Sequence, residues 1–156
     1  MALEIERKFL LLNDDWRAQV QRELPMSQAY LGGEQCSVRV RISGEFAWLN
    51  IKNAVAGPSR LEFEYEIPHD DAVQLMRLAI EPGIEKVRHI VEYGGYVWEI
   101  DEFAGRNTGL IVAEIELPSV DAIFAKPDWV GTEVTEERRY YNSALAKHPF
   151  DRWEQS

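Results

Sequence analysis

Cysteine is nearly absent from this chain. Cys36 is the only cysteine among 156 residues, so no disulfide can form within the chain. The histidines are few and scattered, and no cluster of cysteine and histidine predicts a zinc site. A lone thiol is typical of a reducing compartment, and we therefore expect a cytoplasmic protein.

Long apolar runs and an excess of positive charge are absent as well. No apolar run approaches the roughly 20 residues of a membrane-spanning helix, and charged residues at positions 4–8 stand where a secretory signal has its apolar core. The 17 Lys and Arg residues are outnumbered by 27 Asp and Glu, for a formal net charge of −10. This charge argues against duplex nucleic acid or an anionic membrane as partner, although it does not exclude a local basic site.

Linkers and long-period repeats are also missing, which predicts a single domain over residues 1–156. Short alternating or apolar segments between turn signals predict about eight strands, over 3–12, 27–31, 36–42, 46–53, 60–67, 85–93, 96–103 and 110–117. Helices are expected from Asp14 or Asp15 to about Glu23, from Pro68 to about Pro82 and near 138–147, with irregular chain at 127–131. The fold class is mainly β (α+β). Eight antiparallel strands can form either a sandwich or a closed barrel, and a closed barrel removes the sheet edges and creates an interior.

Charged residues alternate with apolar ones along most of these strands. Successive side chains of a strand point to opposite faces, so each alternating run places its charges on one face. The cations grouped in this way are Lys8, Arg39, Arg41, Lys52, Lys86 and Arg88. The carboxylates are Glu4, Glu6, Glu62, Glu64, Glu66, Glu99, Asp101, Glu114 and Glu116. The pattern alone leaves open whether these faces point to solvent or to an interior.

The opposite faces of the same strands are apolar. They carry Ile5, Val38, Val40, Ile51, Phe63, Tyr65, Val87, Ile100 and Ile115. If the charges point inward, these residues form a core on the outside of a barrel, beneath the helices.

Charge chemistry favours an interior that holds ions. Enclosed cations and carboxylates are costly unless they are paired or occupied by counter-ions. Oxygen-only ligands select hard ions such as Mg²⁺ or Mn²⁺, and Mg²⁺ is usually held by a few carboxylates together with substrate phosphates. The ligand that suits about six Lys and Arg side chains is a polyphosphate. A metal–triphosphate satisfies both groups.

These residues, in this order, resemble the CYTH superfamily, the triphosphate tunnel metalloenzymes. Glu4-Ile5-Glu6-Arg7-Lys8 fits the N-terminal ExExK signature, and Arg39-x-Arg41, Lys52, Glu62-x-Glu64-x-Glu66, Lys86-x-Arg88, Asp101 and Glu114-x-Glu116 follow. The segment Glu133-Val134-Thr135 with Arg139-Tyr140 and Asn142 is similar to the C-terminal part of the family. The resemblance therefore covers nearly the whole chain.

The resemblance implies an eight-stranded antiparallel closed β-barrel that forms a tunnel, with short helices packed outside. By position, it implies substrate binding by Lys8, Arg39, Arg41, Lys52, Lys86 and Arg88. It implies metal binding by Glu4, Glu6, Glu62, Glu64, Asp101, Glu114 and Glu116. Glu66 and Glu99 share strand faces with these residues. Among these residues we expect Glu4, Glu6, Lys8, Lys52 and Glu64 to be catalytic.

The expected activity is hydrolysis of a triphosphate that depends on Mg²⁺ or Mn²⁺. Inorganic tripolyphosphate is favoured as the substrate, because a compact chain needs no base pocket for it. Class IV adenylate cyclase, thiamine triphosphatase and a non-catalytic polyphosphate or nucleotide sensor are the alternatives. We expect Trp48, Trp98 and Trp129 to pack rather than to stack on a base. The sequence leaves the oligomeric state open and allows a homodimer.

Overall fold

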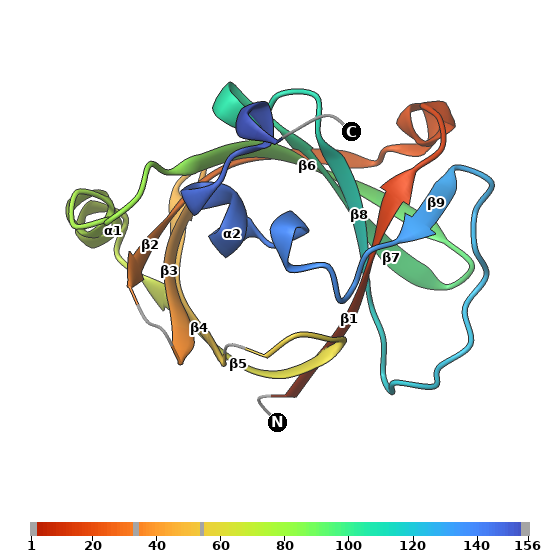
Figure 1. Ribbon diagram of the computed structural model, residues 1–156, viewed down its shortest axis with the longest axis horizontal. Helices are drawn as coiled ribbons and strands as arrows, with labels where there is room; N and C mark the ends of the chain where they lie inside the picture. Colours follow the sequence, from red (N-terminus) through yellow and green to blue (C-terminus); the bar gives the residue numbers. More distant parts are fainter. Residues whose placement is uncertain (1–2, 33–34, 54, 154–156) are drawn as a thin grey trace.

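Eight antiparallel strands close into a barrel in the computed structural model, which describes residues 3–32, 35–53 and 55–153 (Figure 1). The strands are β1 (Leu3–Leu11), β2 (Arg22–Gly32), β3 (Cys36–Ser43), β4 (Phe46–Asn53), β5 (Ser59–Ile67), β6 (Ile84–Tyr93), β7 (Tyr96–Phe103) and β8 (Ile111–Glu116). Their order around the barrel is β5-β4-β3-β2-β6-β7-β8-β1. The pairing of Leu3 with Leu61 and of Ile5 with Ser59 joins β1 to β5 and closes the ring. The closed barrel, and not the sandwich, is therefore the fold.

Tight two-residue hairpins connect β3 to β4 and β6 to β7, where the sequence has turn signals. Gly94 and Gly95 between β6 and β7 have φ values of 61° and 81°, which a two-residue turn of type I′ requires. A ninth strand, β9 (Val130–Glu133), pairs with the end of β1. The sequence predicted irregular chain at 127–131, because a four-residue strand that follows Pro127 carries little pattern.

Two of the expected helices are shorter than predicted. The segment after β1 forms only a 3-10 helix, η1 (Asp15–Gln19), and β2 already begins at Arg22. Pro25 lies inside β2. Strand β3 pairs with β2 only from Ser27 onward, so the N–H that proline lacks removes no hydrogen bond from the sheet. Helix α1 (His69–Met76) ends well before Pro82.

The third expected helix is interrupted. A 3-10 turn, η3 (Arg138–Tyr140), is followed by Tyr141 in an extended conformation and then by α2 (Asn142–Lys147). Short 3-10 turns η2 (Gly105–Asn107) and η4 (Phe150–Arg152) complete the structure. Among the residues described, no helix is both long and apolar enough to cross a membrane.

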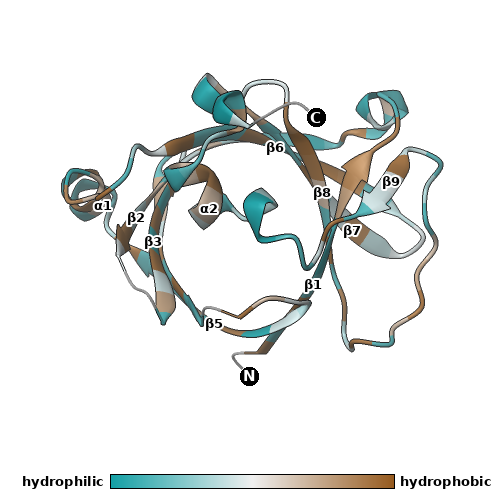
Figure 2. Cartoon of the chain, viewed as in Figure 1, coloured by the Kyte–Doolittle hydropathy of each residue, from teal (hydrophilic) through white to brown (hydrophobic). Residues whose placement is uncertain are grey.

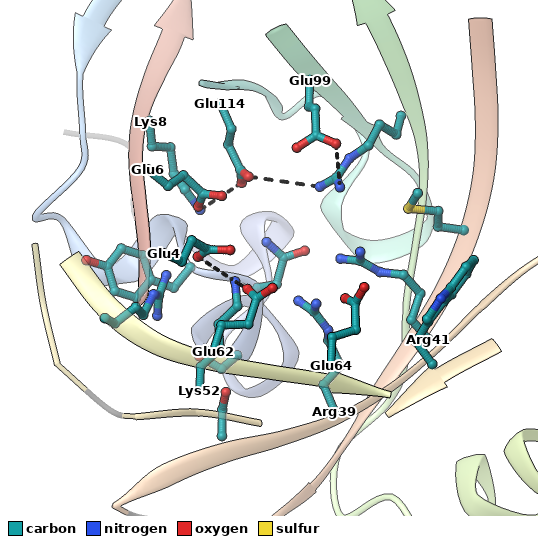
Figure 3. Close-up of a pocket in the computed structure, with 18 of the residues that line it drawn as sticks. Glu4, Glu6, Lys8, Arg39, Arg41, Lys52, Glu62, Glu64, Glu99 and Glu114 are labelled. Carbon is teal, nitrogen blue, oxygen red and sulfur yellow. Dashed lines mark hydrogen bonds and ion pairs between the residues drawn. The ribbon is translucent and has the colours of Figure 1, made fainter. Parts of the chain in front are cut away.

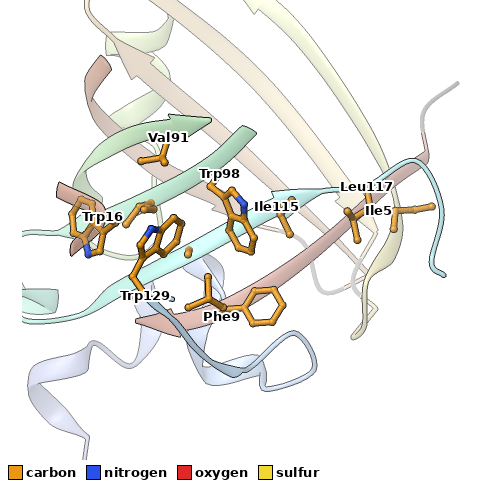
Figure 4. Packing of buried hydrophobic residues seen from close by; sticks show 11 residues of the cluster. Ile5, Phe9, Trp16, Val91, Trp98, Ile115, Leu117 and Trp129 are labelled. Carbon is orange, nitrogen blue, oxygen red and sulfur yellow. The ribbon is translucent and has the colours of Figure 1, made fainter. Parts of the chain in front are cut away.

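The apolar core lies mainly outside the barrel wall. Figure 2 shows hydrophobic and hydrophilic segments following one another along the strands. The largest cluster packs the outward faces of β1, β6, β7 and β8 against η1 and the segment before β9 (Figure 4). Trp98 and Trp129 are buried there, with ring centroids 5.5 Å apart, as expected for packing residues.

A second covering element is α1, which packs on β2, β3 and β4. Ala72 of this helix and Val40 and Ala47 of the strands beneath it are fully buried. The outward Phe63 and Tyr65 of β5 stay 43% and 57% exposed. The expectation that these two residues belong to the core is therefore wrong. Ile5, Val40, Ile100 and Ile115 are buried as predicted.

Candidate functional site: a charged cavity inside the barrel

The inward side chains of the strands line a cavity of about 320 Å³. Because side chains alternate along each strand, every second residue of an alternating run faces this space. The lining includes twelve of the predicted site residues: Glu4, Glu6, Lys8, Arg39, Arg41, Lys52, Glu62, Glu64, Lys86, Arg88, Glu114 and Glu116. Figure 3 shows the labelled side chains converging from different strands, with Arg39 and Arg41 on the side of the cavity away from Glu6 and Lys8.

Opposite charges face one another across neighbouring strands. The register places Lys8 beside Glu114 and Lys52 beside Glu62. The Lys52 ammonium lies 3.1 Å from a carboxylate oxygen of Glu4 and 3.1 Å from one of Glu62. Lys8 Nζ lies 3.3 Å from Glu114 Oε1. This pairing reduces the cost of enclosing charge in the interior.

The carboxyl groups also crowd one another. Burial raises the pKa of Glu4 to about 9, and the neighbouring Glu62 and Glu6 carboxylates add to this rise. The pKa of Glu62 is lowered to about 2 despite its burial, through Glu4 and Lys52, so the two carboxyl groups share one proton. Burial and the charge of Glu114 raise the pKa of Glu6 to about 7. A divalent cation would replace the protons that now relieve this repulsion.

These pairs suit a metal that is only partly held by the protein. Over the described ranges, no three carboxylate, histidine or cysteine side chains converge into a closed metal-binding group. The carboxylates meet in pairs instead, Glu4 with Glu62 and Glu6 with Glu114. A hard ion such as Mg²⁺ is typically bound by one or two carboxylates, substrate phosphate oxygens and water. The donor set fits such an ion.

The cations of the cavity need an anion. Arg39 Nε is buried and has no hydrogen-bond partner among the residues described. Burial and the charges of Arg39 and Arg88 lower the pKa of Arg41. Burial, opposed by Asp101, lowers the pKa of Lys86 to about 7. A bound polyanion would relieve the repulsion and give the unpartnered N–H an acceptor.

Asp101 is placed differently from the other predicted metal ligands. It is not among the residues that line the cavity, and its side chain is 1% exposed. Both of its oxygens accept charge-assisted hydrogen bonds, at 2.7 Å from Lys86 Nζ and at 2.8 and 2.9 Å from Arg88. These cations and their hydrogen bonds lower its pKa to about 2, against the effect of burial. Asp101 thus forms ion pairs with two of the cations that line the cavity, although it does not itself line it.

Several residues that the sequence did not identify also line the cavity. Arg60 shares the inward face of β5 with Glu62 and Glu64, so the same alternation could have identified it. Tyr141 and Asn142 reach the cavity from the break between η3 and α2, for which no periodic signal exists. Helix α2 therefore begins at the cavity and does not simply pack outside the barrel.

An amide network connects this segment to the cations. Asn142 Oδ1 accepts hydrogen bonds from Lys86 Nζ and from Gln28 Nε2, both at 3.0 Å. Gln28 is fully buried, and its Oε1 accepts a 2.9 Å bond from Arg41 Nε. The Tyr141 ring lies 5.2 Å from both Lys8 Nζ and the Arg60 guanidinium carbon. The segment thus touches several of the cations that face the cavity.

Two aromatic residues also line the cavity. Tyr30 does so, and its hydroxyl lies 3.4 Å from Gln28 Nε2. Trp48 lines the cavity too and is half-buried there, with its ring packed against Phe46. Glu99 is a lining residue that pairs with Arg88 at 3.2 Å, whereas Glu66 is not part of the lining.

Fold and site together define a closed antiparallel barrel whose interior is built for a metal-bound polyanion. The CYTH domain model matches residues 2–148, and the chain belongs to that family. It is 43% identical over 151 residues to an inorganic triphosphatase from Acetivibrio thermocellus, covering 96% of this chain and 97% of that protein. It is 35% identical over 149 residues to an inorganic triphosphatase from Nitrosomonas europaea, covering 92% and 96%.

A solved structure supports the same assignment. The crystal structure of an inorganic triphosphatase superposes with a TM-score of 0.66 at 33% identity, covering 92% of this chain and 97% of the other. The resemblance drawn from the sequence motifs is therefore confirmed. The family implies a requirement for a divalent metal.

Proposed function

We propose that this chain is a triphosphatase that hydrolyses inorganic tripolyphosphate with Mg²⁺ or Mn²⁺. One observation carries the proposal: the described lining of the cavity contains seven carboxyl groups and seven cationic groups, although the whole chain is strongly acidic. Such a lining suits a polyanion that arrives with its metal. Two relatives named inorganic triphosphatase, each matched over nearly its full length, support the choice of substrate.

The cations are proposed to hold the phosphate oxygens. Lys8, Arg39, Arg41, Lys52, Lys86 and Arg88 come from several strands and surround the cavity, and Arg60 joins them. Their positive charge offsets the charge that develops on the phosphoryl oxygens during hydrolysis. Lys52 sits between Glu4 and Glu62, and these carboxylates with Glu6 raise its pKa even though burial lowers it, so it stays charged.

The carboxylates are proposed to hold the metal and to orient water. The proposed ligands are Glu4, Glu6, Glu62, Glu64, Glu114 and Glu116, and a bound divalent ion neutralises phosphate charge. Glu114 is buried, whereas Glu64 and Glu116 are exposed at the cavity, where water can approach. Among all these residues, Glu4, Glu6, Lys8, Lys52 and Glu64 are proposed to be catalytic. Asp101 is proposed to position Lys86 and Arg88.

Purified protein incubated with tripolyphosphate, ATP or thiamine triphosphate tests the proposal. Phosphate, pyrophosphate and cyclic AMP are measured with Mg²⁺, with Mn²⁺ and with a chelator. We expect phosphate release that depends on metal and is fastest from tripolyphosphate. Cyclic AMP with pyrophosphate would make the chain a cyclase, and preference for thiamine triphosphate would make it a thiamine triphosphatase. Tight binding of tripolyphosphate without any hydrolysis would make it a sensor.

The proposed partner is a small triphosphate, and neither duplex nucleic acid nor a membrane is proposed. The cytoplasm is the proposed location, on the grounds of the lone Cys36.

A further inference from the structure

The first residue of α2 brings a neutral amide to the charged cavity. Figure 1 shows α2 within the outline of the ring of strands, and the half-buried Asn142 lines the cavity. The Tyr141 hydroxyl donates a 2.6 Å hydrogen bond to the Thr135 carbonyl oxygen and accepts one at 3.3 Å from the Gly57 N–H. Leu145, three residues further along α2, is fully buried. These contacts on both sides hold Asn142 in one place beside the cations.

The orientation of the Asn142 amide is fixed by its neighbours. Arginine and lysine side chains can only donate hydrogen bonds, so an amide beside them must present its oxygen. Arg41 Nε donates to Gln28 Oε1 at 2.9 Å, which turns Gln28 Nε2 toward Asn142. Gln28 Nε2 and Lys86 Nζ then both donate to Asn142 Oδ1, each at 3.0 Å. Exchanging the oxygen and nitrogen of either amide would place donors against donors.

The amide nitrogen of Asn142 is left without a protein acceptor. Its N–H groups donate to none of the residues that the structure describes, although the side chain lines the cavity. Lys86 has three N–H donors, of which Asp101 Oδ2, at 2.7 Å, and Asn142 Oδ1 take two. The third donor of Lys86 remains for a ligand. Because Nδ2 and Oδ1 of Asn142 are bonded to the same carbon, one phosphate group can reach both Nδ2 and the Lys86 ammonium.

We propose that Asn142 is a further substrate-binding residue, whose Nδ2 donates a hydrogen bond to an oxygen of the phosphate group that Lys86 binds. Gln28 is then a positioning residue, which acts on the substrate only through Asn142 and Arg41. The inference rests on the proposed function, because the acceptor is the triphosphate in the same cavity. A neutral donor adds a hydrogen bond to the anion without adding another positive charge among crowded cations.

Nuclear magnetic resonance of protein labelled with ¹⁵N only in its asparagines tests the contact directly. The chain has five asparagines, Asn13, Asn50, Asn53, Asn107 and Asn142, so five side-chain amides are observed. The probe is Mg²⁺ with the methylene-bridged analogue of tripolyphosphate, whose P–C–P bonds cannot be hydrolysed and whose other oxygens are retained. The spectrum of Asn142→Asp assigns the Asn142 signals. Asn107 is the reference, because it is buried outside this cavity with its Oδ1 bonded to the Phe150 N–H at 2.9 Å.

We expect the analogue to shift one Asn142 amide proton downfield and to leave the Asn107 amide unmoved. A scalar correlation between the Asn142 ¹⁵N nucleus and a ³¹P nucleus of the analogue should also appear, because such a coupling passes through an N–H···O–P hydrogen bond. If the analogue binds and the Asn142 amide signals stay as constant as those of Asn107, the contact is refuted.

Variants separate a direct contact from a structural role. Asn142→Asp keeps an acceptor for Lys86 and Gln28 and removes the donor, whereas Asn142→Leu removes both. Asn13→Asp is the matched control: Asn13 is exposed outside the cavity, its Oδ1 accepts a 2.9 Å bond from the Asp15 N–H, and the substitution adds the same charge. For each variant, calorimetry measures binding of the analogue with Mg²⁺, steady-state kinetics use tripolyphosphate, and urea denaturation verifies folding.

We expect Asn142→Asp to weaken binding of the analogue about tenfold or more and to raise the KM for tripolyphosphate to the same extent, with kcat within about threefold of wild type. Asn142→Leu should lose affinity as well, and Asn13→Asp should match the wild type. A wild-type KM in Asn142→Asp beside a raised KM in Asn142→Leu would make Asn142 a positioning residue only and overturn the proposal. If the wild-type chain neither binds the analogue nor hydrolyses tripolyphosphate, the proposed function has failed and this inference with it. If the wild type does both while the Asn142 amide does not respond, this inference alone has failed.

Discussion

Metal binding in the cavity is expected to compete with protons. The raised pKa values of Glu4, about 9, and Glu6, about 7, mean that at pH 7 the first is protonated and the second half-protonated. A divalent ion binds the ionised form, so it must displace these protons. We therefore expect about 1.5 protons to be released per site filled at pH 7, and affinity to rise about tenfold per pH unit between pH 7 and 9. Above pH 9 the rise should level off.

Calorimetry with Mg²⁺ measures this directly. Titrations at pH 7 in two buffers of different ionisation enthalpy give the number of protons released, and repeats at pH 8 and 9 give the slope. Glu4→Gln removes the proton that titrates near pH 9, so its affinity should be lower and should rise only about twofold between pH 7 and 9, as Glu6 loses its remaining proton. Glu92→Gln, an exposed glutamate at the end of β6, is the control and should behave as wild type. Equal wild-type affinity at pH 7 and 9, without proton release, would falsify the reasoning.

Three further predictions concern the same cavity. Lys52→Ala should abolish turnover by weakening tripolyphosphate binding, and Glu64→Ala should abolish it by weakening Mg²⁺ binding. Calorimetry with each ligand separates the two effects. Wild-type activity in either variant would show that its side chain takes no part in the reaction. Asp101→Asn should lower the free energy of unfolding in urea by about 3 kcal/mol, because it removes the counter-charge of buried Lys86 and leaves Arg88 paired with Glu99 and Glu114 alone. It should also raise the KM for tripolyphosphate with Mg²⁺ affinity unchanged, whereas a loss of Mg²⁺ affinity would identify Asp101 as a metal ligand. The metal-free protein should lose stability as pH rises from about 5 to 7, because the folded state keeps the Glu4 and Glu6 protons that the unfolded chain, with pKa values near 4.5, gives up. Above pH 7 the lowered pKa of Lys86 makes stability rise with pH, so urea denaturation should be compared between about pH 5 and 7. A rise in stability between these two pH values would contradict the raised pKa values of Glu4 and Glu6.

Local pattern accounts for most of what the sequence predicted correctly. Strand positions follow from period-two alternation and from glycine turns, and both are properties of neighbouring residues. The errors occur where a distant partner decides the outcome. Strand β9 forms by pairing with the end of β1, and Phe63 stays 43% exposed although the alternation assigned it to the apolar face of β5.

The same distinction runs through the cavity. Arg60 followed the alternation and could have been found, whereas Asn142 reaches Lys86 from a break in helical structure that carries no periodic signal. Asp101 and Glu99 share one face of β7, yet Glu99 lines the cavity and Asp101 is buried behind two cations. Alternation assigns a side chain to one face of the strand, but it does not determine how deeply that side chain is buried.

The sequence by itself determined which residues share a face, because successive side chains of a strand point to opposite faces. The order of the charged residues along the chain also identified the family. Only the tertiary structure decided that the charged faces point inward. That outcome depends on the pairing of β1 with β5, a contact between residues more than fifty positions apart in the chain. Closing the ring also brought carboxylates of different strands close enough to share protons, and it left two aromatic rings of β4 beside an arginine of β3 at one end of the cavity.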